Sequence, residues 1–304
     1  MQPITETFIE LNKVPTKVST IGKKVGETFD DNENLVIIIP GNPGLNSFYD
    51  KFARRINENL SCSVWCVGHA GHNYTAEKLK GVPKYNENKE VYGLDGQVQN
   101  KVDFFEKYVP KNARVHLIGH SIGSYMAVNL LDKPTISEKI NKAYLLFPTI
   151  EYMAKTPNGL FLNGFLRSII WFVVLMSGLF AILPHFIQTA LLYGYMSIVG
   201  MPKHNCDIIR SLIRPAILKR VFFLAYEEMD QVLERNSHSL EHNIKKVKLL
   251  YGETDGWTPL QYYTNLKKDI PDIDAEVTSF NHAFVLNRSD ELGDMVCDWI
   301  KNKA

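Results

Sequence analysis

Cysteine is scarce in this chain, and its few cysteines follow no metal-binding or disulfide pattern. The chain has 304 residues and four cysteines, with no C-x-x-C pair: Cys62, Cys66, Cys206 and Cys297. Neither a disulfide framework nor a zinc site is indicated by these spacings. We therefore expect no metal, and no motif implies a cofactor.

The chain also lacks a charge imbalance. It carries 34 Lys and Arg against 33 Asp and Glu, a net charge of +1. Binding to nucleic acid needs a concentrated basic face, so nucleic acid is not an expected partner. The first residues show no basic and then apolar signal segment, which predicts an intracellular protein. A hydrophobic content of 45% excludes a disordered chain.

The third absence is local. Residues 168–202 contain no Asp, Glu, Lys or Arg, although the chain average of 22% would place about eight there. Ser168 to Leu183 (SIIWFVVLMSGLFAIL) contains 13 apolar residues of 16, and Pro184 follows. A membrane-spanning helix needs about 20 apolar residues without a break, so a hairpin or a pair of interfacial helices fits this pattern better.

Residues around this segment favour a lipid surface. Basic residues outnumber Asp207 in the following stretch: Lys203, Arg210, Arg214, Lys219 and Arg220. Such residues suit anionic head groups, and Trp171, Tyr193 and Tyr195 suit the interface itself. We expect residues 160–202 to contact a membrane or lipid surface. The alternative is a helical lid buried against the rest of the protein.

Strands and helices alternate along most of the chain. Strand-like runs occur at TFIEL and TKVSTI, which resemble an antiparallel hairpin, and at 35–39, 63–67, 114–118, 143–147, 247–251 and 275–280; helical runs occur at 48–60, 93–108 and 290–301. This alternation predicts an α/β fold with a mostly parallel central sheet flanked by helices. Residues 150–242 are helical and apolar throughout, so we expect a single domain, 1–304, with a large helical cap inserted between two late strands.

Ser121 is the candidate nucleophile. It lies in Gly119-His120-Ser121-Ile122-Gly123, a G-x-S-x-G motif that directly follows a strand and precedes a helix. In that context the turn is sharp, and the hydroxyl stands above the sheet near a helix N-terminus. The alternative is a structural serine in a turn.

The serine needs a base and an orienting acid, in the chain order Ser, acid, His. Asp255 in YGETDGWTP and His282 in FNHAFV each follow a late strand in that order. His282 would accept the Ser121 proton, and Asp255 would hold the imidazole. Other acids remain open as alternatives to Asp255: Glu253, Glu151 and Asp230.

The other histidines fit catalysis less well. His120 adjoins the serine, so its side chain should point away. His69 and His72 lie in a loop at the same sheet edge, where they would line the pocket but lack a third metal ligand. His238 and His242 are four residues apart on a predicted helix, typical of a solvated face.

An oxyanion hole needs two backbone N–H groups aimed at one point. Ile122 follows the nucleophile and is the first candidate. The second should come from the turn Pro40-Gly41-Asn42-Pro43-Gly44, where Asn42 is preferred because Pro43 has no N–H. The alternative is that this segment is only a tight turn.

Four segments together resemble the lipid droplet-associated hydrolase family: IIPGNPGLNSFYDKF, LIGHSIGSYMA, YGETDGWTP and NHAFV. The resemblance covers nearly the whole chain, including the apolar insertion. It implies an α/β-hydrolase fold and a triad of Ser121, Asp255 and His282. It also implies residence on lipid droplets and the endoplasmic reticulum, on the cytosolic face, and activity on sterol esters or related neutral lipids such as acylglycerols.

These observations favour a serine esterase that acts on a lipid ester through an acyl-enzyme, without metal or cofactor. Two alternatives belong to other classes. One is a lipid-droplet structural or interaction protein with little turnover, and the other is an acyltransferase that passes the acyl group to an alcohol.

Overall fold

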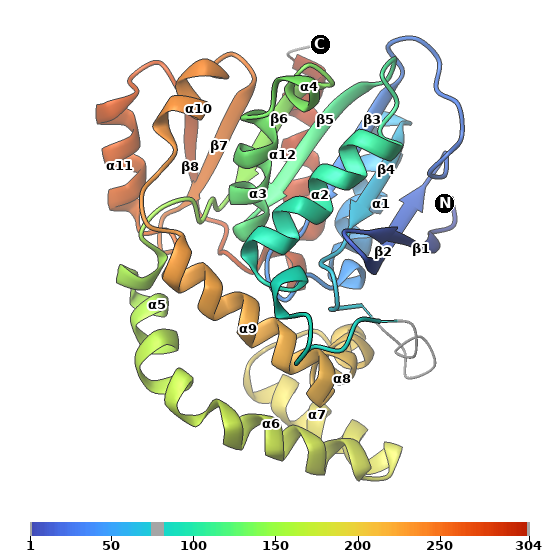
Figure 1. Ribbon diagram of the computed structural model, residues 1–304, viewed down its shortest axis with the longest axis vertical. Helices are drawn as coiled ribbons and strands as arrows, with labels where there is room; N and C mark the ends of the chain where they lie inside the picture. The colour runs from blue at the N-terminus through green and yellow to red at the C-terminus, as the bar shows by residue number, and fades with distance from the viewer. Residues whose placement is uncertain (1, 74–81, 303–304) are drawn as a thin grey trace.

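The computed structural model describes residues 2–73 and 82–302. All β-strands within these residues belong to one sheet. Its eight strands lie in the order β1-β2-β4-β3-β5-β6-β7-β8 (Figure 1). They are β1 (Thr5–Leu11), β2 (Val14–Ile21), β3 (Asn34–Ile39), β4 (Ser63–Val67), β5 (Arg114–His120), β6 (Ile140–Leu146), β7 (Val247–Gly252) and β8 (Asp274–Thr278). β1 and β2 form the predicted hairpin, β2 and β4 are also antiparallel, and the other neighbours pair in parallel.

Helices cover both faces of this sheet. They include α1 (Asp50–Leu60), α2 (Leu94–Tyr108), α3 (Ile122–Leu131), α4 (Pro134–Ser137), α11 (Leu260–Asp269) and α12 (Ser289–Asn302). Alternate residues of a strand point to opposite faces. In β3, Leu35 and Ile37 accordingly join the core cluster that contains residues of α2 and α3, whereas Val36 and Ile38 join the cluster that contains residues of α1 and α12.

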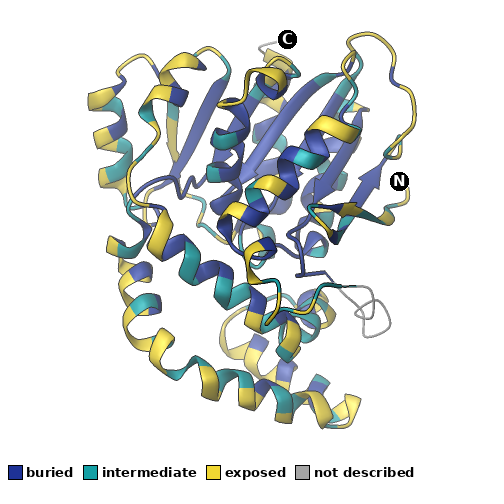
Figure 2. Cartoon of the chain, viewed as in Figure 1, coloured by how far each residue is buried: buried dark blue, intermediate teal, exposed yellow. Residues whose placement is uncertain are grey.

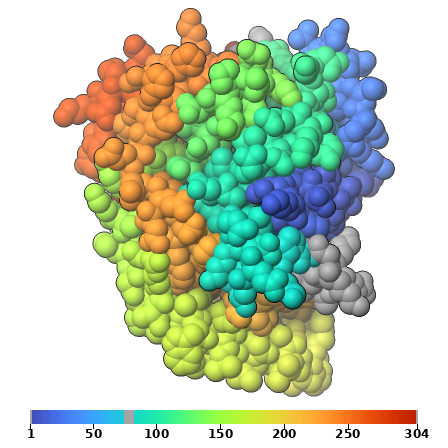
Figure 3. All heavy atoms as spheres, in the orientation of Figure 1, coloured from blue at the N-terminus to red at the C-terminus, as the bar shows by residue number. Residues whose placement is uncertain are grey.

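A long helical insertion connects β6 to β7. It contains α5 (Pro157–Phe161), a π-helical turn (Leu162–Leu166), α6 (Arg167–Ile182), α7 (His185–Ile198), α8 (Cys206–Leu212), α9 (Pro215–Gln231) and α10 (Ser237–His242). Most of it lies below the sheet in Figure 1 and forms the lower end of the molecule in Figure 3. The predicted fold class is confirmed: a mostly parallel sheet flanked by helices, with an apolar helical insertion between two late strands.

Some element boundaries differ from the prediction. The helix expected from Phe48 begins with a 3₁₀ turn, Asn46–Tyr49, before α1. The last strand ends at Thr278 and not at Phe280. The largest difference concerns α6, because α5, the π turn and α6 form one continuous helical segment of 26 residues, Pro157–Ile182. By length and composition this segment is long and apolar enough to cross a bilayer, which the apolar run of 16 residues alone was not.

Candidate active site

Ser121 occupies a sharp turn between β5 and α3. Its backbone angles are φ 54° and ψ −123°, a left-handed region of φ that costs free energy for a non-glycine residue. The turn requires close approach of its neighbours. A Cβ atom on Gly123 would lie 2.2 Å from the Ile39 carbonyl oxygen, and one on Gly119 would lie 2.6 Å from the Gly123 carbonyl oxygen. The two glycines of the motif therefore permit the packing that holds the serine in this conformation.

His282 lies between Ser121 and Asp255. Its Nε2 atom is 2.8 Å from Ser121 Oγ, and its Nδ1 atom is 2.7 Å from Asp255 Oδ2. A carboxylate only accepts hydrogen bonds, so Nδ1 donates to Asp255 and Nε2 is left to accept the serine proton. The three residues follow β5, β7 and β8, at the same edge of the sheet.

The Asp255 carboxylate is buried and fully hydrogen-bonded. Oδ1 accepts from the backbone N–H of Trp257 at 2.7 Å, and Oδ2 also accepts from Thr258 Oγ1 at 2.8 Å. Burial opposes ionisation, but the hydrogen bonds from His282, Trp257 and Thr258 outweigh it and hold the pKa of Asp255 below its ordinary value. The acid is thus ionised at neutral pH and able to stabilise a protonated His282.

The three alternative acids have other positions. Glu253 is exposed, Glu151 pairs with Arg235 at 2.8 Å, and Asp230 pairs with Arg167 at 2.9 Å. The hydrogen bond to His282 belongs to Asp255 alone among the four.

The two candidate oxyanion donors lie in backbone segments next to Ser121. Ile122 is the first residue of α3, so its N–H has no acceptor within the helix. Asn42 lines the same cavity as Ser121. Within the described part of the chain, neither backbone N–H has a hydrogen-bond acceptor, as an oxyanion hole requires.

Comparisons with known proteins identify the family. The family model for lipid-droplet associated hydrolase matches residues 32–285. The chain belongs to the lipid droplet-associated hydrolase family. It is 38% identical to the lipid droplet-associated hydrolase of Drosophila melanogaster, with 97% of this chain and 98% of the relative covered. It is 33% identical to the Mus musculus protein and 31% identical to the Homo sapiens protein of the same name, each covering 99% of this chain and 96% of the relative.

Solved structures support the α/β-hydrolase fold of this hydrolase. The meta-cleavage product hydrolase CumD superimposes with a TM-score of 0.65 at 15% identity, covering 98% of both chains. An esterase from Exiguobacterium antarcticum gives a TM-score of 0.60 at 14% identity, covering 98% of this chain and all of its own. The predicted family and fold are both confirmed.

His120, expected to point away from the serine, has no hydrogen bond to Ser121 among the described residues but links two other parts of the site. Its Nε2 atom is 2.9 Å from the His282 carbonyl oxygen, and its Nδ1 atom is 2.5 Å from Tyr49 Oη, which also accepts from the Gly41 N–H at 2.8 Å. Because the carbonyl only accepts, Nε2 donates and Nδ1 accepts from Tyr49. Burial and the neighbouring His282 lower the pKa of His120 to about 3, which keeps this arrangement neutral.

His69 and His72 lie behind the turn that contains Asn42 and do not line the catalytic cavity. Both are fully buried, and their rings are 5.6 Å apart. His72 Nδ1 donates to the Pro43 carbonyl at 2.7 Å, which makes it a support of the turn. No cluster of potential metal ligands occurs among the described residues. His238 and His242 are exposed on α10, as predicted.

The hydrolase has a second buried acid at the site, Glu228 of α9, which the sequence analysis missed. It is 3% exposed and lines the cavity with Ser121 and His282. Its Oε1 atom accepts from Asn42 Nδ2 at 3.0 Å, and the same amide nitrogen donates to the Val221 carbonyl at 3.0 Å. A signal was present, since Glu228 lies four residues after Leu224, on the apolar side of the helix.

Proposed function

We propose that this hydrolase is a serine esterase that cleaves neutral lipid esters at the surface of lipid droplets. The observation that carries the proposal is the pair of short contacts from His282, 2.8 Å to Ser121 Oγ and 2.7 Å to Asp255 Oδ2. A serine, an imidazole and a buried carboxylate in this order form an activated nucleophile.

The reaction follows from these positions. Ser121 Oγ attacks the ester carbonyl carbon while His282 Nε2 takes its proton, and Asp255 stabilises the imidazolium. The N–H groups of Ile122 and Asn42 donate to the oxyanion of the tetrahedral intermediate. Its collapse expels the alcohol, which receives the proton from His282 and leaves an acyl group on Ser121. Water then attacks that acyl group, with His282 as the base, and the fatty acid is released. No cofactor or metal takes part.

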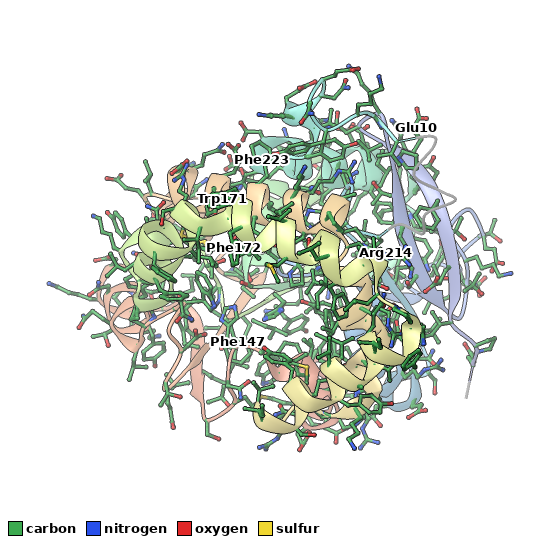
Figure 4. The ribbon with its side chains drawn as sticks, turned by 90° about the horizontal axis from the view of Figure 1, so that it is seen from below. Glu10, Phe147, Trp171, Phe172, Arg214 and Phe223 are labelled. Carbon is green, nitrogen blue, oxygen red and sulfur yellow. The ribbon has the colours of Figure 1, made fainter. Side chains whose placement is uncertain are left out.

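Exposed apolar side chains support a lipid surface as the place of action. Large apolar residues of α5, α6 and α7 are exposed, most of all Phe186 at 73%, Ile182 at 79% and Ile198 at 86%, and Trp171 of α6 is 68% exposed. Figure 2 shows the exposed residues along α5 and α6, and Figure 4 looks onto this surface from below, with Trp171 and Phe172 labelled on α6. Soluble proteins rarely expose so many large apolar side chains on neighbouring helices, and a lipid monolayer would cover them.

The charged residues favour a position on the lipid and not across it. Arg167 at the start of α6 forms two hydrogen bonds of 2.9 Å to the Asp230 carboxylate of α9, which ties α6 along the protein. Residues 160–202 therefore form the lipid-contacting segment in our proposal, at droplets and at the cytosolic face of the endoplasmic reticulum.

The expected basic flank needs one correction. Arg220 is buried, and its guanidinium lies 4.7 Å from the ring centre of Tyr92, so it is not directed at a lipid head group. Arg210 is committed to Asp207 and Thr189. Lys203, Arg214 and Lys219 are exposed and remain candidates for contact with anionic lipid.

An apolar groove lies next to the catalytic cavity. It has a volume of about 500 Å³, lies between α6 and α9, and is lined by residues that include Trp171, Lys219 and Phe222. Phe222 also lines the catalytic cavity of about 280 Å³, so one side chain borders both. An acyl chain in the groove would lie against this side chain.

The test is labelling with a fluorophosphonate probe on lipid vesicles, with the modified peptide identified by mass spectrometry. The wild-type protein should be labelled at Ser121, and Ser121→Ala and His282→Ala should not be labelled. Ser168→Ala, on the exposed side of α6, is the matched control and should be labelled like the wild type. A folded, vesicle-bound wild type that takes no label would refute the esterase and favour a structural role on droplets.

A further inference from the structure

The catalytic cavity combines a small volume with a polar group that ester hydrolysis does not use. Its volume of about 280 Å³ is at the lower limit of small-molecule pockets, about 300–1,000 Å³. It therefore holds the ester group and the atoms next to it, while longer chains extend outside. Any polar group on its wall contacts the part of the substrate closest to the scissile bond.

Glu228 is that polar group. Most of the cavity wall is apolar, with residues such as Met153, Leu218 and Phe222. Glu228 is 3% exposed, and within the described part of the chain its side chain has one hydrogen-bond donor, Asn42, which binds Oε1. Oε2 has no donor among those residues, and none of the described cavity-lining residues is a lysine or arginine.

A fully apolar alcohol group would leave this carboxyl unsatisfied. Covering a buried polar group without a hydrogen bond lowers affinity, and a site arranged around such a group discriminates against ligands that leave it unpaired. A sterol ester presents only hydrocarbon around its ester group. A triacylglycerol presents further esters, which accept hydrogen bonds but do not donate them. An ester of a polyol with a free hydroxyl presents a group that both donates and accepts.

We propose that Glu228 recognises a free hydroxyl on the alcohol portion of the substrate, so that the preferred substrates are partial glycerides and similar hydroxyl-bearing lipid esters. This inference rests on the esterase function proposed above and narrows its substrate class. Glu228 is then a specificity-determining residue, held in place by Asn42.

The ionisation of the acid agrees with this role. Burial raises the pKa of Glu228 to about 8, against the opposing hydrogen bond from Asn42. At neutral pH the carboxyl group is mainly protonated, so it donates through Oε2–H and also accepts at its free lone pairs. A hydroxyl can satisfy both, whereas an ester can satisfy the donor alone.

The experiment compares two esters that differ in one non-hydrogen atom, a hydroxyl in place of a methyl group: 2-hydroxyethyl octanoate and propyl octanoate. The value of kcat/KM is measured for both on vesicle-bound protein, for the wild type, Glu228→Gln and Glu228→Leu. The wild type should prefer the hydroxyethyl ester about tenfold or more. Glu228→Gln retains a donor and an acceptor and should keep a preference, whereas Glu228→Leu should bring the ratio to about one or reverse it.

The ratio separates recognition from other effects of the substitution. Loss of Glu228 also frees the Asn42 amide. This effect would lower kcat/KM for both esters alike, so it cancels in the ratio of the two values. Glu227→Leu is the matched control, because Glu227 bonds Gln231 and does not line the cavity. It should leave the preference unchanged.

Each outcome has a distinct meaning. Equal rates for the two esters in a wild type that is labelled by fluorophosphonate would overturn the hydroxyl recognition and leave the esterase intact. A preference that persists in Glu228→Leu would assign the hydroxyl to another residue and also overturn it. Absence of both labelling and hydrolysis would instead overturn the esterase function and, with it, this inference.

Discussion

Strand β3 and helix α6 are two of the most apolar segments of the hydrolase, yet they place their side chains in opposite environments. Residues Leu35 to Ile39 of β3 are completely buried. In α6 the buried residue is a serine, Ser177, whereas Trp171 and Ile182 are 68% and 79% exposed. The protein itself covers the apolar surface of β3, but much of the apolar surface of α6 has no cover within the described chain.

This difference shows that the apolar composition of a segment does not by itself indicate what its side chains pack against. The side chains of β3 pack against helices on both faces of the sheet, so burial of their apolar surface stabilises the folded state. In α6 the same gain in free energy is available only on association with another apolar phase. The comparison thus divides the molecule into a part where apolar residues give stability and a part where we propose that they give location.

The largest expected effect separates catalysis from location. Replacing Ser121 by alanine should lower ester hydrolysis by about 10⁴-fold or more, since the nucleophile is lost. Binding to lipid droplets or vesicles should not change, because Ser121 is only 8% exposed and lies outside the proposed lipid-contacting segment, residues 160–202. The two measurements are hydrolysis rate and vesicle co-sedimentation. Residual activity near the wild-type level would contradict the assignment of the nucleophile.

A second pair of substitutions compares two isoleucines directly. Ile37→Ala in β3 should lower the free energy of unfolding by about 2–5 kcal/mol, because it creates a cavity in the core. Ile182→Ala, which removes the same atoms from an exposed position, should change it by less than about 0.5 kcal/mol. Urea denaturation in the absence of lipid measures both. Equal losses would show that α6 contributes to the folded core more than its exposure indicates.

A third change addresses location alone. The double substitution Trp171→Glu and Ile182→Glu should weaken binding to neutral-lipid droplets about 100-fold or more, from the loss of two large apolar side chains and the addition of two charges. Stability without lipid should change little. Glu234→Gln, at another exposed site, serves as the control for surface changes. Unaltered droplet binding would refute the role of residues 160–202.

The effect that is smallest in a single step of the measurement, one pH unit, concerns the buried side of the insertion. Since the pKa of Glu228 is raised to about 8 by burial, the folded state binds more protons than the unfolded state between about pH 4.5 and pH 8. Stability from this group is complete below about pH 4.5 and declines as pH rises toward 8. In Glu228→Gln this decline is absent, so the variant should gain on the wild type by up to about 1.4 kcal/mol per pH unit in that range.

Urea denaturation at pH 5, 6, 7 and 8 measures this difference. The buried histidines titrate in both proteins and cancel. Glu227→Gln makes the same substitution one position away, outside the catalytic cavity, and is the matched control. A Glu228→Gln curve that runs parallel to the wild type would show that burial does not raise the pKa of Glu228.

The sequence was sufficient for much of the fold and for the positions brought together around Ser121. The β-branched run of β3 and the strand before G-x-S-x-G are strong local signals. Chain order indicates His282 and favours Asp255, but it left Glu253, Glu151 and Asp230 open as the acid. The full length of the helix through α6 was not predicted. Thr156 caps it, with its hydroxyl accepting from the Gly159 N–H at 3.0 Å, and Pro157 occupies its first position. Helix formation thus starts well before the apolar run.

The residues that were missed depend on long-range packing. Glu228 was passed over because glutamates on helices are usually solvated, and its contact with Asn42 spans 186 positions in the chain. For His120 the sequence predicts only a side chain that points away from the serine, and the hydrogen bond from its ring to the backbone of His282, 162 positions later, was missed. Arg220, placed with the basic flank, is buried because α9 turns that side toward Tyr92. A local sequence pattern cannot predict contacts between residues so far apart in the chain.

The two hydrogen bonds of the Asn42 amide, to Val221 and Glu228 of α9, limit how this protein can be rebuilt. The insertion begins after β6 and ends before β7, two neighbouring strands of the sheet, so it resembles an exchangeable module. Helix α9 of the insertion nevertheless supplies both acceptors for a side chain in the turn after β3. A chimera that grafts a foreign insertion onto this sheet would need matching acceptors, or a different residue at position 42, before the turn after β3 has the same support.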